Sequence, residues 1–326
     1  MTPKIGEIVI ANLRQRSKKA LELAKQTLQA EKMEHPKLRE ALEHYISYWD
    51  DFTHPGLFSL ACEAVGGDPD GAVPTQAAIA MMAAAFDIHD DIIDKSKMKH
   101  EIPTVYGKFG EEIAILLGNA FLIEGFSLLG KTLPVLHQEK ANVFEIIKRS
   151  LYEFGNAHTL ELSFKKRTDL PPEEYLRIVE MKAASIEGDM RIGAIIGGGT
   201  DEEVESLARY GRILGTLAIL REEFVDIFDS EELKHRISSE YLPIPVLFAM
   251  QNAESREHIE RLLAKKVTSR NIDDLVDIVF ETKNVKEFKK YMEGLVVEAN
   301  NLTSEIRDVN LRNQTRKVAS STLEDL

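Results

Sequence analysis

The 326-residue sequence is poor in cysteine and in positive charge. Cys62 is its one cysteine, which excludes an internal disulfide and is typical of a chain that stays in a reducing compartment. There are 41 Lys and Arg residues against 54 Asp and Glu residues, for a formal net charge of −13. This excess of acid argues against nucleic acid or an anionic membrane surface as a main partner. An anionic substrate would therefore need local cations or a metal ion to bind.

Long apolar runs are missing as well. No apolar run approaches the ~18–20 residues that a membrane-spanning helix needs. Residues 1–19 are too polar for a signal peptide. We therefore expect a soluble, cytoplasmic protein without a membrane span.

The sequence also lacks signs of β-structure and of linkers between domains. Strand-like alternation never lasts for more than a few residues, and no low-complexity linker or internal repeat divides the chain. Helical periodicity fills most of the sequence instead. The run Gly197–Gly199 is the one candidate boundary, and we interpret it as a turn between packed helices. The sequence thus predicts a single all-α domain over residues 1–326, a helical bundle.

One stretch stands out against this background, residues 77–94. Ten uncharged residues are followed by Asp87, Asp90, Asp91 and Asp94, which fall at i, i+3, i+4 and i+7 and so share one face of a helix. A solvated acidic face is the ordinary alternative, but the apolar run should bury this helix and turn the acids toward an interior cleft. Clustered carboxylates repel one another and are hard oxygen ligands, so we predict that they bind Mg²⁺.

A second acidic cluster ends a second apolar helix, which we expect over residues 201–229. Thr200 and Glu203 form a capping box at its start. The clustered acids are Glu222, Glu223 and Asp226. Two such helices, facing each other in a bundle, could hold a shared group of Mg²⁺ ions. Metal ions held in this way would stabilise a diphosphate leaving group.

Three lysines could complete an anion site. Lys182 lies in the middle of a predicted helix among mostly uncharged neighbours, which is unusual for a lysine. Lys99 and Lys234 follow the two acidic helices and could reach the same diphosphate. The alternative for both is an ordinary surface lysine.

The motifs resemble those of a known family. The run Asp90-Asp91-Ile92-Ile93-Asp94 resembles the first aspartate-rich motif of the trans-isoprenyl diphosphate synthases, or polyprenyl synthetases. Residues 174–182 are similar to the family's lysine helix, and residues 214–226 match its second motif in position. Residues 60–67 and 103–119 look like the segments on either side of the first motif.

The resemblance implies a fold and a reaction. The fold is the isoprenoid-synthase type, a helical bundle around a deep apolar pocket, usually in a homodimer. The reaction is Mg²⁺-assisted ionisation of an allylic isoprenoid diphosphate, followed by attack of isopentenyl diphosphate, as in geranyl, farnesyl or geranylgeranyl diphosphate synthases. The implied catalytic residues are Asp90, Asp91, Asp94 and Lys182. The implied metal ligands are Asp90, Asp94 and Glu222, with Glu223 and Asp226 completing the second motif.

The sequence departs from the family at the site for isopentenyl diphosphate. Asp51 stands where a lysine is expected, and His54 stands where an arginine is expected. Ala83 replaces a histidine, and His100 replaces the second of two arginines after the first motif. We expect His54 to be mostly neutral at pH 7, because the ordinary pKa of histidine is about 6.5. The second-substrate site is therefore predicted to be altered.

Two residues one turn before Asp90 are expected to limit the hydrocarbon pocket. Ala85 is small, whereas Phe86 is bulky and lies at i−4 from Asp90, so that its ring can lie over the same face. Ordinary core packing is the alternative for Phe86.

The sequence is compatible with three functions. The first is a prenyltransferase that elongates an allylic diphosphate with isopentenyl diphosphate. The second is an enzyme like the class I terpene synthases, which ionises the same substrate and captures the cation with its own alkenes or with water. The third is a non-catalytic partner subunit of an active synthase. Intact acidic motifs disfavour the third, and prenyl transfer ranks first.

Overall fold

The computed structural model is almost entirely helical. It describes residues 4–99, 101–132, 140–164, 170–239, 241–263, 269–324 and 326. Among them, the only β-structure is one antiparallel hairpin of two-residue strands, β1 (Met98–Lys99) and β2 (Ile102–Pro103). The predicted all-α fold class is confirmed.

The helices divide into two compact units by their contacts. Unit 1 contains residues 1–146 and 189–205, and unit 2 contains residues 147–188 and 206–326. The α-helices up to residue 132 are α1 (Ile5–Ala30), α2 (Pro36–Tyr48), α3 (Thr53–Ala64), α4 (Val73–Ile93), α5 (Val105–Phe109) and α6 (Glu111–Thr132). The later α-helices are α7 (Lys140–Phe164), α8 (Pro172–Lys182), α9 (Ala184–Ile196), α10 (Asp201–Val225), α11 (Ser230–Ser239), α12 (Ile244–Ala249), α13 (Ala253–Leu263), α14 (Ser269–Glu281), α15 (Lys283–Leu302) and α16 (Val309–Ser321). Two short 3₁₀ helices are η1 (Pro69–Ala72) and η2 (Thr303–Glu305).

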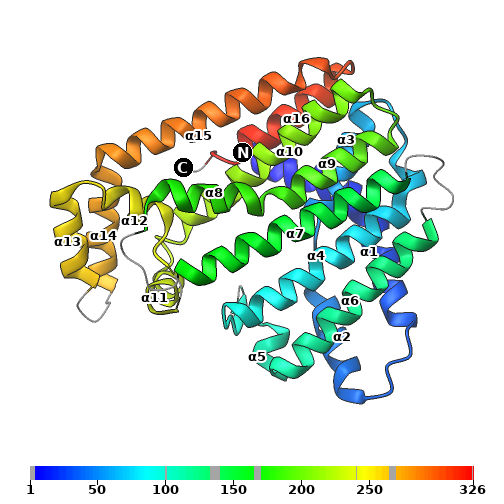
Figure 1. The fold of residues 1–326 in the computed structure, drawn as a ribbon, viewed down its shortest axis with the longest axis horizontal. Coiled ribbons are helices and arrows are strands. Elements are labelled where there is room, and N and C mark those ends of the chain that lie inside the picture. Colours follow the sequence, from blue (N-terminus) through cyan, green and yellow to red (C-terminus); the bar gives the residue numbers. More distant parts are fainter. Residues whose placement is uncertain are drawn as a thin grey trace. The chain divides into compact units, whose positions relative to one another are not determined.

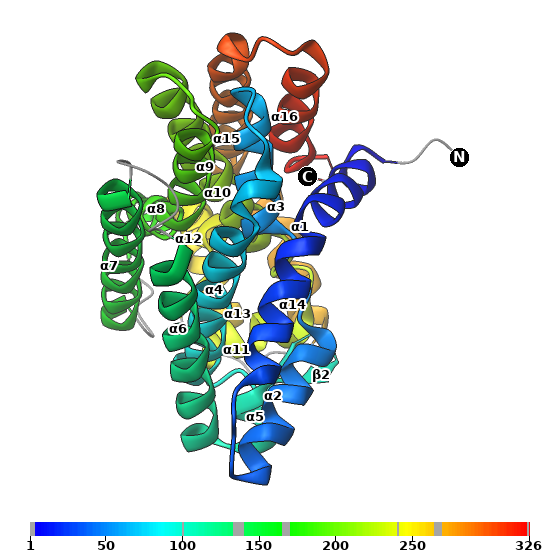
Figure 2. The same cartoon turned by 90° about the vertical axis from the view of Figure 1, so that its right-hand side faces the viewer.

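The acid-bearing helix α4 forms the centre of unit 1. It packs against α1, α3 and α6, and Figure 2 shows it between α6 and α1. Its uncharged stretch supplies the buried side chains Ala77, Ala80, Met81, Ala84, Ala85 and Ile88 to a core that also contains Tyr45, Trp49 and Phe121. The apolar run before the acids is therefore used to bury α4.

Two glycines let α6 approach α4 closely. A Cβ atom at Gly125 would lie 2.8 Å from Met82 Cγ and 3.0 Å from the carbonyl oxygen of Ala78. A Cβ atom at Gly118 would collide with the imidazole of His89. At Gly118 the imidazole would have to move aside, and at Gly125, where a backbone oxygen is involved, the close approach favours a residue without a side chain.

Two helical stretches are long and apolar enough to cross a membrane by length and composition alone. They are Pro69–Ile93 and Glu111–Thr132. Most of the first apolar window is buried inside unit 1, as in the core helix of a globular protein, whereas a third of the second is buried. The expectation that no run reaches this length is therefore wrong, and the absence of a membrane span stays a prediction.

Unit 2 is organised around α12 and α15. Helix α12 packs against α8, α14 and α15, and α15 also packs against α14 and α16. Figure 1 shows α13 and α14 side by side. Helix α15 also contacts η2. Aromatic rings fill this core; Phe224 of α10 stacks on Phe288 of α15 with ring centres 5.8 Å apart.

The helix ends differ from expectation at two places that bear on the site. The helix expected to continue beyond Lys182 breaks at Ala183, whose ψ angle of −1° ends α8 before α9 begins. The second acidic helix ends at Val225 and not near residue 229. There, Asp229 Oδ1 accepts the backbone N–H groups of Glu231 and Glu232 at 2.9 and 3.1 Å. Asp229 thus caps α11.

Candidate active site

The first acidic motif occupies the C-terminal end of α4. Asp87, Asp90 and Asp91 lie in its last two turns, and Asp94 is the C-cap residue, whose N–H donates to the Asp90 carbonyl at 2.9 Å. This end of a helix carries the negative pole of its dipole, so carboxylates are doubly unfavourable there. The cluster needs positive charge from outside the helix.

Lys99 supplies part of that charge by folding back onto α4. Lys95 adopts a positive φ of 58° directly after the helix, and the β1–β2 hairpin then returns the chain toward the acids. The Lys99 ammonium lies 2.6 Å from Asp87 Oδ1 and 2.9 Å from Asp91 Oδ1. His100, the neighbouring position of the predicted altered site, lies outside the described residues.

Asp91 is the buried member of the cluster. Burial raises the pKa of its carboxyl to about 7, although the Lys99 ammonium acts in the opposite direction. The hydroxyl of Tyr45 donates to Asp87 Oδ2 at 3.2 Å. Lys99 and Tyr45 therefore hold Asp87 and Asp91 in place, on the side of α4 next to Asp90 and Asp94.

A cavity of about 470 Å³ adjoins this motif within unit 1. Three of the four positions predicted to form the altered second-substrate site, Asp51, His54 and Ala83, line it. Asp87, Asp91 and Lys99 line it as well. The structure thus brings residues from three separate parts of the sequence into one pocket. The remaining walls are mainly aromatic and polar: Tyr45, Tyr48, Trp49, Asp50, Thr53, Ala84, Ile102 and Thr104.

His54 is charged in this pocket. Its Nδ1 atom lies 2.6 Å from Asp189 Oδ2, and the Asp189 side chain is 6% exposed. Burial lowers the pKa of His54, but the charges of Asp51 and Asp189 outweigh it and raise the pKa from 6.5 to about 9. The expectation that His54 is mostly neutral at pH 7 is therefore wrong. The positive charge of His54 is nevertheless paired with the carboxylate of Asp189.

Asp51 has a structural role at the start of α3. Its Oδ1 atom accepts the backbone N–H groups of Thr53 and His54 at 3.1 and 3.2 Å. Its Oδ2 atom is buried and has no hydrogen-bond partner among the described residues. Burial raises the pKa of the Asp51 carboxyl, against the effect of His54. A carboxyl group therefore stands where the family resemblance places a lysine.

The two positions expected to limit the hydrocarbon pocket lie one turn before Asp90 on α4. Ala85 is fully buried, and Phe86 is partly buried. Their role in setting product size stays a prediction.

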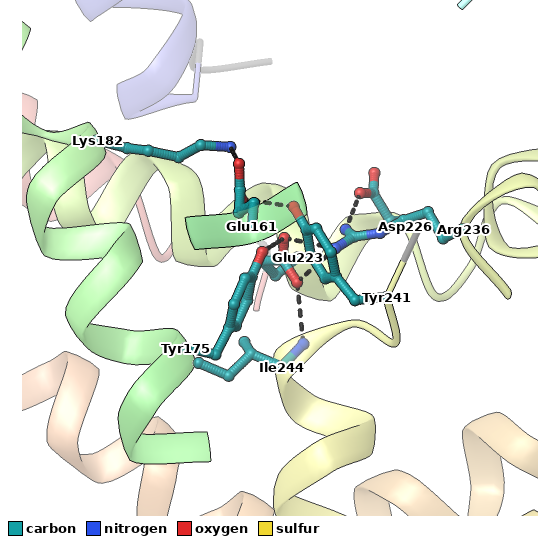
Figure 3. A network of polar contacts seen from close by, with 8 residues as sticks. All are labelled: Glu161, Tyr175, Lys182, Glu223, Asp226, Arg236, Tyr241 and Ile244. Atoms are coloured by element: carbon teal, nitrogen blue, oxygen red, sulfur yellow. Dashed lines mark hydrogen bonds and ion pairs between the residues drawn. The ribbon is translucent and has the colours of Figure 1, made fainter. Parts of the chain in front are cut away.

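The second acidic motif lies in unit 2, where Glu223 is buried in a network of donors (Figure 3). The Tyr175 hydroxyl donates to its Oε1 at 2.8 Å, and the Ile244 N–H donates to its Oε2 at 2.9 Å. The guanidinium of Arg236 donates to both oxygens, at 2.8 and 3.0 Å. Protein donors thus occupy the whole carboxylate.

The other two acids of this motif differ in environment. Asp226 Oδ2 accepts from Arg236 Nη1 at 2.7 Å. Burial raises the pKa of Asp226 to about 6, with Arg236 opposing and Glu223 adding to the rise. The side chain of Glu222 is 62% exposed and contacts Arg221 at 2.7 Å. Lys234, proposed above as a diphosphate ligand, pairs with Glu231 at 2.6 Å on α11.

Lys182 ends α8 within the same network. Its ammonium lies 2.6 Å from Glu161 Oε2, and the Tyr241 hydroxyl donates to Glu161 Oε1 at 2.7 Å. The rings of Tyr241 and Tyr175 are 4.8 Å apart, and Arg236 lies over the Tyr241 ring. Lys182 and the second acidic motif are therefore linked through Glu161 and Tyr241, as Figure 3 shows.

Comparison with known sequences identifies the family. The sequence model of the family described as polyprenyl synthetase matches residues 24–279. The chain belongs to the polyprenyl synthetase family. It is 30% identical over 233 residues to a short chain isoprenyl diphosphate synthase of Methanothermobacter thermautotrophicus, covering 70% of this chain and 71% of that one. It is 26% identical over 254 residues to a geranylgeranyl diphosphate synthase of Sulfolobus acidocaldarius, covering 75% and 77%.

Solved structures of polyprenyl synthetases share the fold. A geranylgeranyl pyrophosphate synthetase from Pyrococcus horikoshii superposes with a TM-score of 0.85 at 22% identity, covering 99% of this chain and all of that one. A decaprenyl diphosphate synthase from Rhodobacter capsulatus superposes with a TM-score of 0.83 at 20% identity, covering 98% of each chain. This polyprenyl synthetase therefore has the all-α isoprenoid-synthase fold, and the predicted family is confirmed. The enzyme class is that of a trans-prenyltransferase.

The two acidic motifs of this polyprenyl synthetase differ in how well they suit a metal ion. Asp90 and Asp94 lie one turn apart, and their hard oxygens suit Mg²⁺. Glu223 does not suit a metal, because its oxygens already accept hydrogen bonds from protein donors. No group of three or more His, Cys, Asp or Glu side chains in the described ranges is arranged to hold a metal by itself. The predicted Mg²⁺ ligands, and a cluster shared by both motifs, stay predictions.

Three polar residues of the site were not foreseen: Asp189, Glu161 and Arg236. Asp189 is 135 residues away from His54 in sequence, so no local pattern could pair them. Glu161 and Arg236 lie in ordinary amphipathic helices, α7 and α11, whose charged residues look like surface residues. The available signal was the apolar stretch that ends in Glu223, because a buried carboxylate requires a counter-ion.

Proposed function

We propose that this polyprenyl synthetase is a Mg²⁺-dependent enzyme that ionises an allylic isoprenoid diphosphate. The observation that carries the proposal is the end of α4, where Lys99 pairs with Asp87 and Asp91 while Asp90 and Asp94 lie one turn apart beside them. When bound by Asp90 and Asp94, Mg²⁺ would supply the positive charge that a departing diphosphate needs.

The residues of the chain would orient the substrate around that reaction. Lys99 and Tyr45 hold Asp87, and Lys99 also holds Asp91, which lies between Asp90 and Asp94 in the sequence of α4. Lys182 would bind the diphosphate after exchanging its contact with Glu161, whose second oxygen stays hydrogen-bonded to Tyr241. Lys99 and Lys234 are the other candidate diphosphate ligands, and each would have to exchange its carboxylate partners for the diphosphate.

Elongation with isopentenyl diphosphate is the first candidate for the fate of the cation. Curated relatives are named as geranylgeranyl and short chain isoprenyl diphosphate synthases, which supports it. We also propose that the enzyme is a cytoplasmic homodimer.

Capture of the cation without isopentenyl diphosphate is the second candidate, and one observation favours it. The pocket that holds the altered positions has Asp51, Asp87 and Asp91 in its wall, while His54 and Lys99 are paired with carboxylates. Carboxylates outnumber cations in this wall, so a second diphosphate would meet a net negative charge there.

Purified protein incubated with Mg²⁺ and a series of allylic diphosphates, with and without isopentenyl diphosphate, tests the proposal. Pyrophosphate release and extracted products are measured. Longer prenyl diphosphates among the products support elongation. Alcohols or cyclic hydrocarbons support capture, if the rate of pyrophosphate release is the same with and without isopentenyl diphosphate. The absence of pyrophosphate release from every allylic substrate would overturn the proposal.

A further inference from the structure

Arg236 is the most deeply buried cation in contact with an acidic motif of this chain, within the residues described. Its side chain is 4% exposed. Its guanidinium donates to both oxygens of Glu223 and to Asp226 Oδ2, at distances from 2.7 to 3.0 Å. One planar cation thus joins two carboxylates of the second motif, the geometry for which a guanidinium is suited and an ammonium is not.

The remaining donors leave no room at Glu223 for a metal ion. The Tyr175 hydroxyl and the Ile244 N–H approach the two oxygens that Arg236 also contacts. A divalent cation could bind Glu223 only by displacing several of these hydrogen bonds. It would then stand beside the fixed charge of Arg236, which repels it.

Glu222 is the exception in this motif. Its side chain is mostly exposed and contacts the side chain of the neighbouring Arg221, a surface pair that is easily exchanged. Neighbouring glutamates therefore have opposite environments, one filled by buried donors and one facing solvent.

We propose that Arg236 is the permanent counter-ion of the second acidic motif and withdraws Glu223 and Asp226 from metal binding. Of the three carboxylates of this motif, all of them described, Glu222 alone is then left to contact a metal ion. Arg236 is a positioning residue, since it acts through the carboxylates that it holds. The inference deepens the proposed function and rests on it only for the claim that Glu222 meets a metal.

Neighbouring glutamates provide a matched test. Mn²⁺ binding in the presence of inorganic pyrophosphate is counted by electron paramagnetic resonance for the wild type, Glu222→Gln and Glu223→Gln. We expect Glu222→Gln to lose one bound Mn²⁺. Glu223→Gln should keep the wild-type number with affinities within about twofold. Loss of one Mn²⁺ in Glu223→Gln, or an unchanged number in Glu222→Gln, would overturn the inference.

The variant Arg236→Met provides the complementary test, in which a metal site should be gained. Removal of the guanidinium should leave two carboxylates that accept one additional Mn²⁺, and a folded variant with no additional Mn²⁺ would count against the inference. If the variant does not fold, the pair of glutamine variants still decides the question. A wild type that binds no Mn²⁺, together with an Arg236→Met variant that does, would overturn the proposed function while supporting the role of Arg236 as a counter-ion.

Discussion

At the scale of single residues, His54 shows how a neighbour changes a charge. The pair with Asp189 and the nearby Asp51 keep its imidazole protonated at neutral pH. The same residue in an unfolded chain would have a pKa of about 6.5. Between pH 6.5 and about pH 9, His54 is therefore mostly protonated in the folded protein and mostly neutral in the unfolded chain.

The pH dependence of stability follows with a definite sign. Because the pKa of His54 is raised to about 9 in the folded protein, its stabilising contribution is fully present below about pH 6.5 and is lost as the pH rises through 9. We expect the free energy of unfolding of the wild type to fall relative to that of His54→Gln over this interval, by on the order of 2–3 kcal/mol. Urea unfolding at pH 6.5 and pH 9.5 measures the difference. Parallel changes in the two proteins would refute the assignment.

Asp51 offers a second residue-scale prediction. At ~4–6 Å and an effective dielectric near 20, one unit pair of like charges repels by roughly 3–4 kcal/mol. Asp51→Asn should therefore raise the affinity for isopentenyl diphosphate by about tenfold or more. The affinity is measured from the dependence of pyrophosphate release on the isopentenyl diphosphate concentration. The triple change Asp51→Lys, His54→Arg, Ala83→His should raise it further.

Stability separates the two Asp51 variants. An asparagine side chain can still accept hydrogen bonds from the N–H groups at the start of α3, whereas a lysine cannot, and its loss of these bonds should lower the free energy of unfolding by about 0.5–2 kcal/mol.

Micromolar saturation by isopentenyl diphosphate in the wild type would contradict the prediction for Asp51, because other residues would then bind this substrate.

At the scale of helices, the close approach of α4 and α6 depends on Gly125. A Cβ atom there would meet Met82 and the Ala78 carbonyl. Gly125→Ala should lower the free energy of unfolding by about 1–3 kcal/mol through overpacking. Gly130→Ala is the matched control on the same helix, since nothing lies within 4 Å of the added methyl group. It should raise stability by about 0.5–1 kcal/mol. Equal effects of the two changes would contradict this packing.

The helices also show what a sequence can and cannot predict. The start of α10 was predictable because the capping box is local: Glu203 Oε2 accepts the Thr200 N–H at 2.8 Å, and Thr200 Oγ1 accepts the Glu203 N–H at 3.3 Å. The end of α10 was not, because it depends on Asp229 capping the next helix and on Arg236 holding Asp226. Buried partners such as Asp189 and Glu161 are joined to the site by the fold alone. The chemistry of the acidic motifs could therefore be predicted from the sequence, whereas their buried counter-ions could not.

At the scale of the whole molecule, α6 presents apolar side chains to solvent in this chain. Leu116 and Ile123 are 54% and 64% exposed, and their spacing of seven residues places them on one face. A second copy of the chain covering this face would account for them.

The oligomeric state provides the test of this arrangement. The wild type should have twice the mass of one chain in light scattering, and Leu116→Glu with Ile123→Glu should yield monomers, because both charges would be buried at the interface. Val309→Glu, at an exposed apolar position of α16, is the control and should leave the mass unchanged. A wild-type mass equal to one chain would exclude the homodimer.

We propose above all that the first acidic motif drives ionisation of an allylic diphosphate through a bound metal ion. The most direct measurement is the single-turnover rate of pyrophosphate release with Mg²⁺ for the wild type, Asp90→Asn and Asp94→Asn. Asp70→Asn, which changes an exposed surface pair with Lys19, serves as the control. We expect the two α4 variants to be slower by about 10²-fold or more, since each removes a hard ligand from the leaving-group metal, and Asp70→Asn to match the wild type. Wild-type rates in Asp90→Asn and Asp94→Asn would contradict the account.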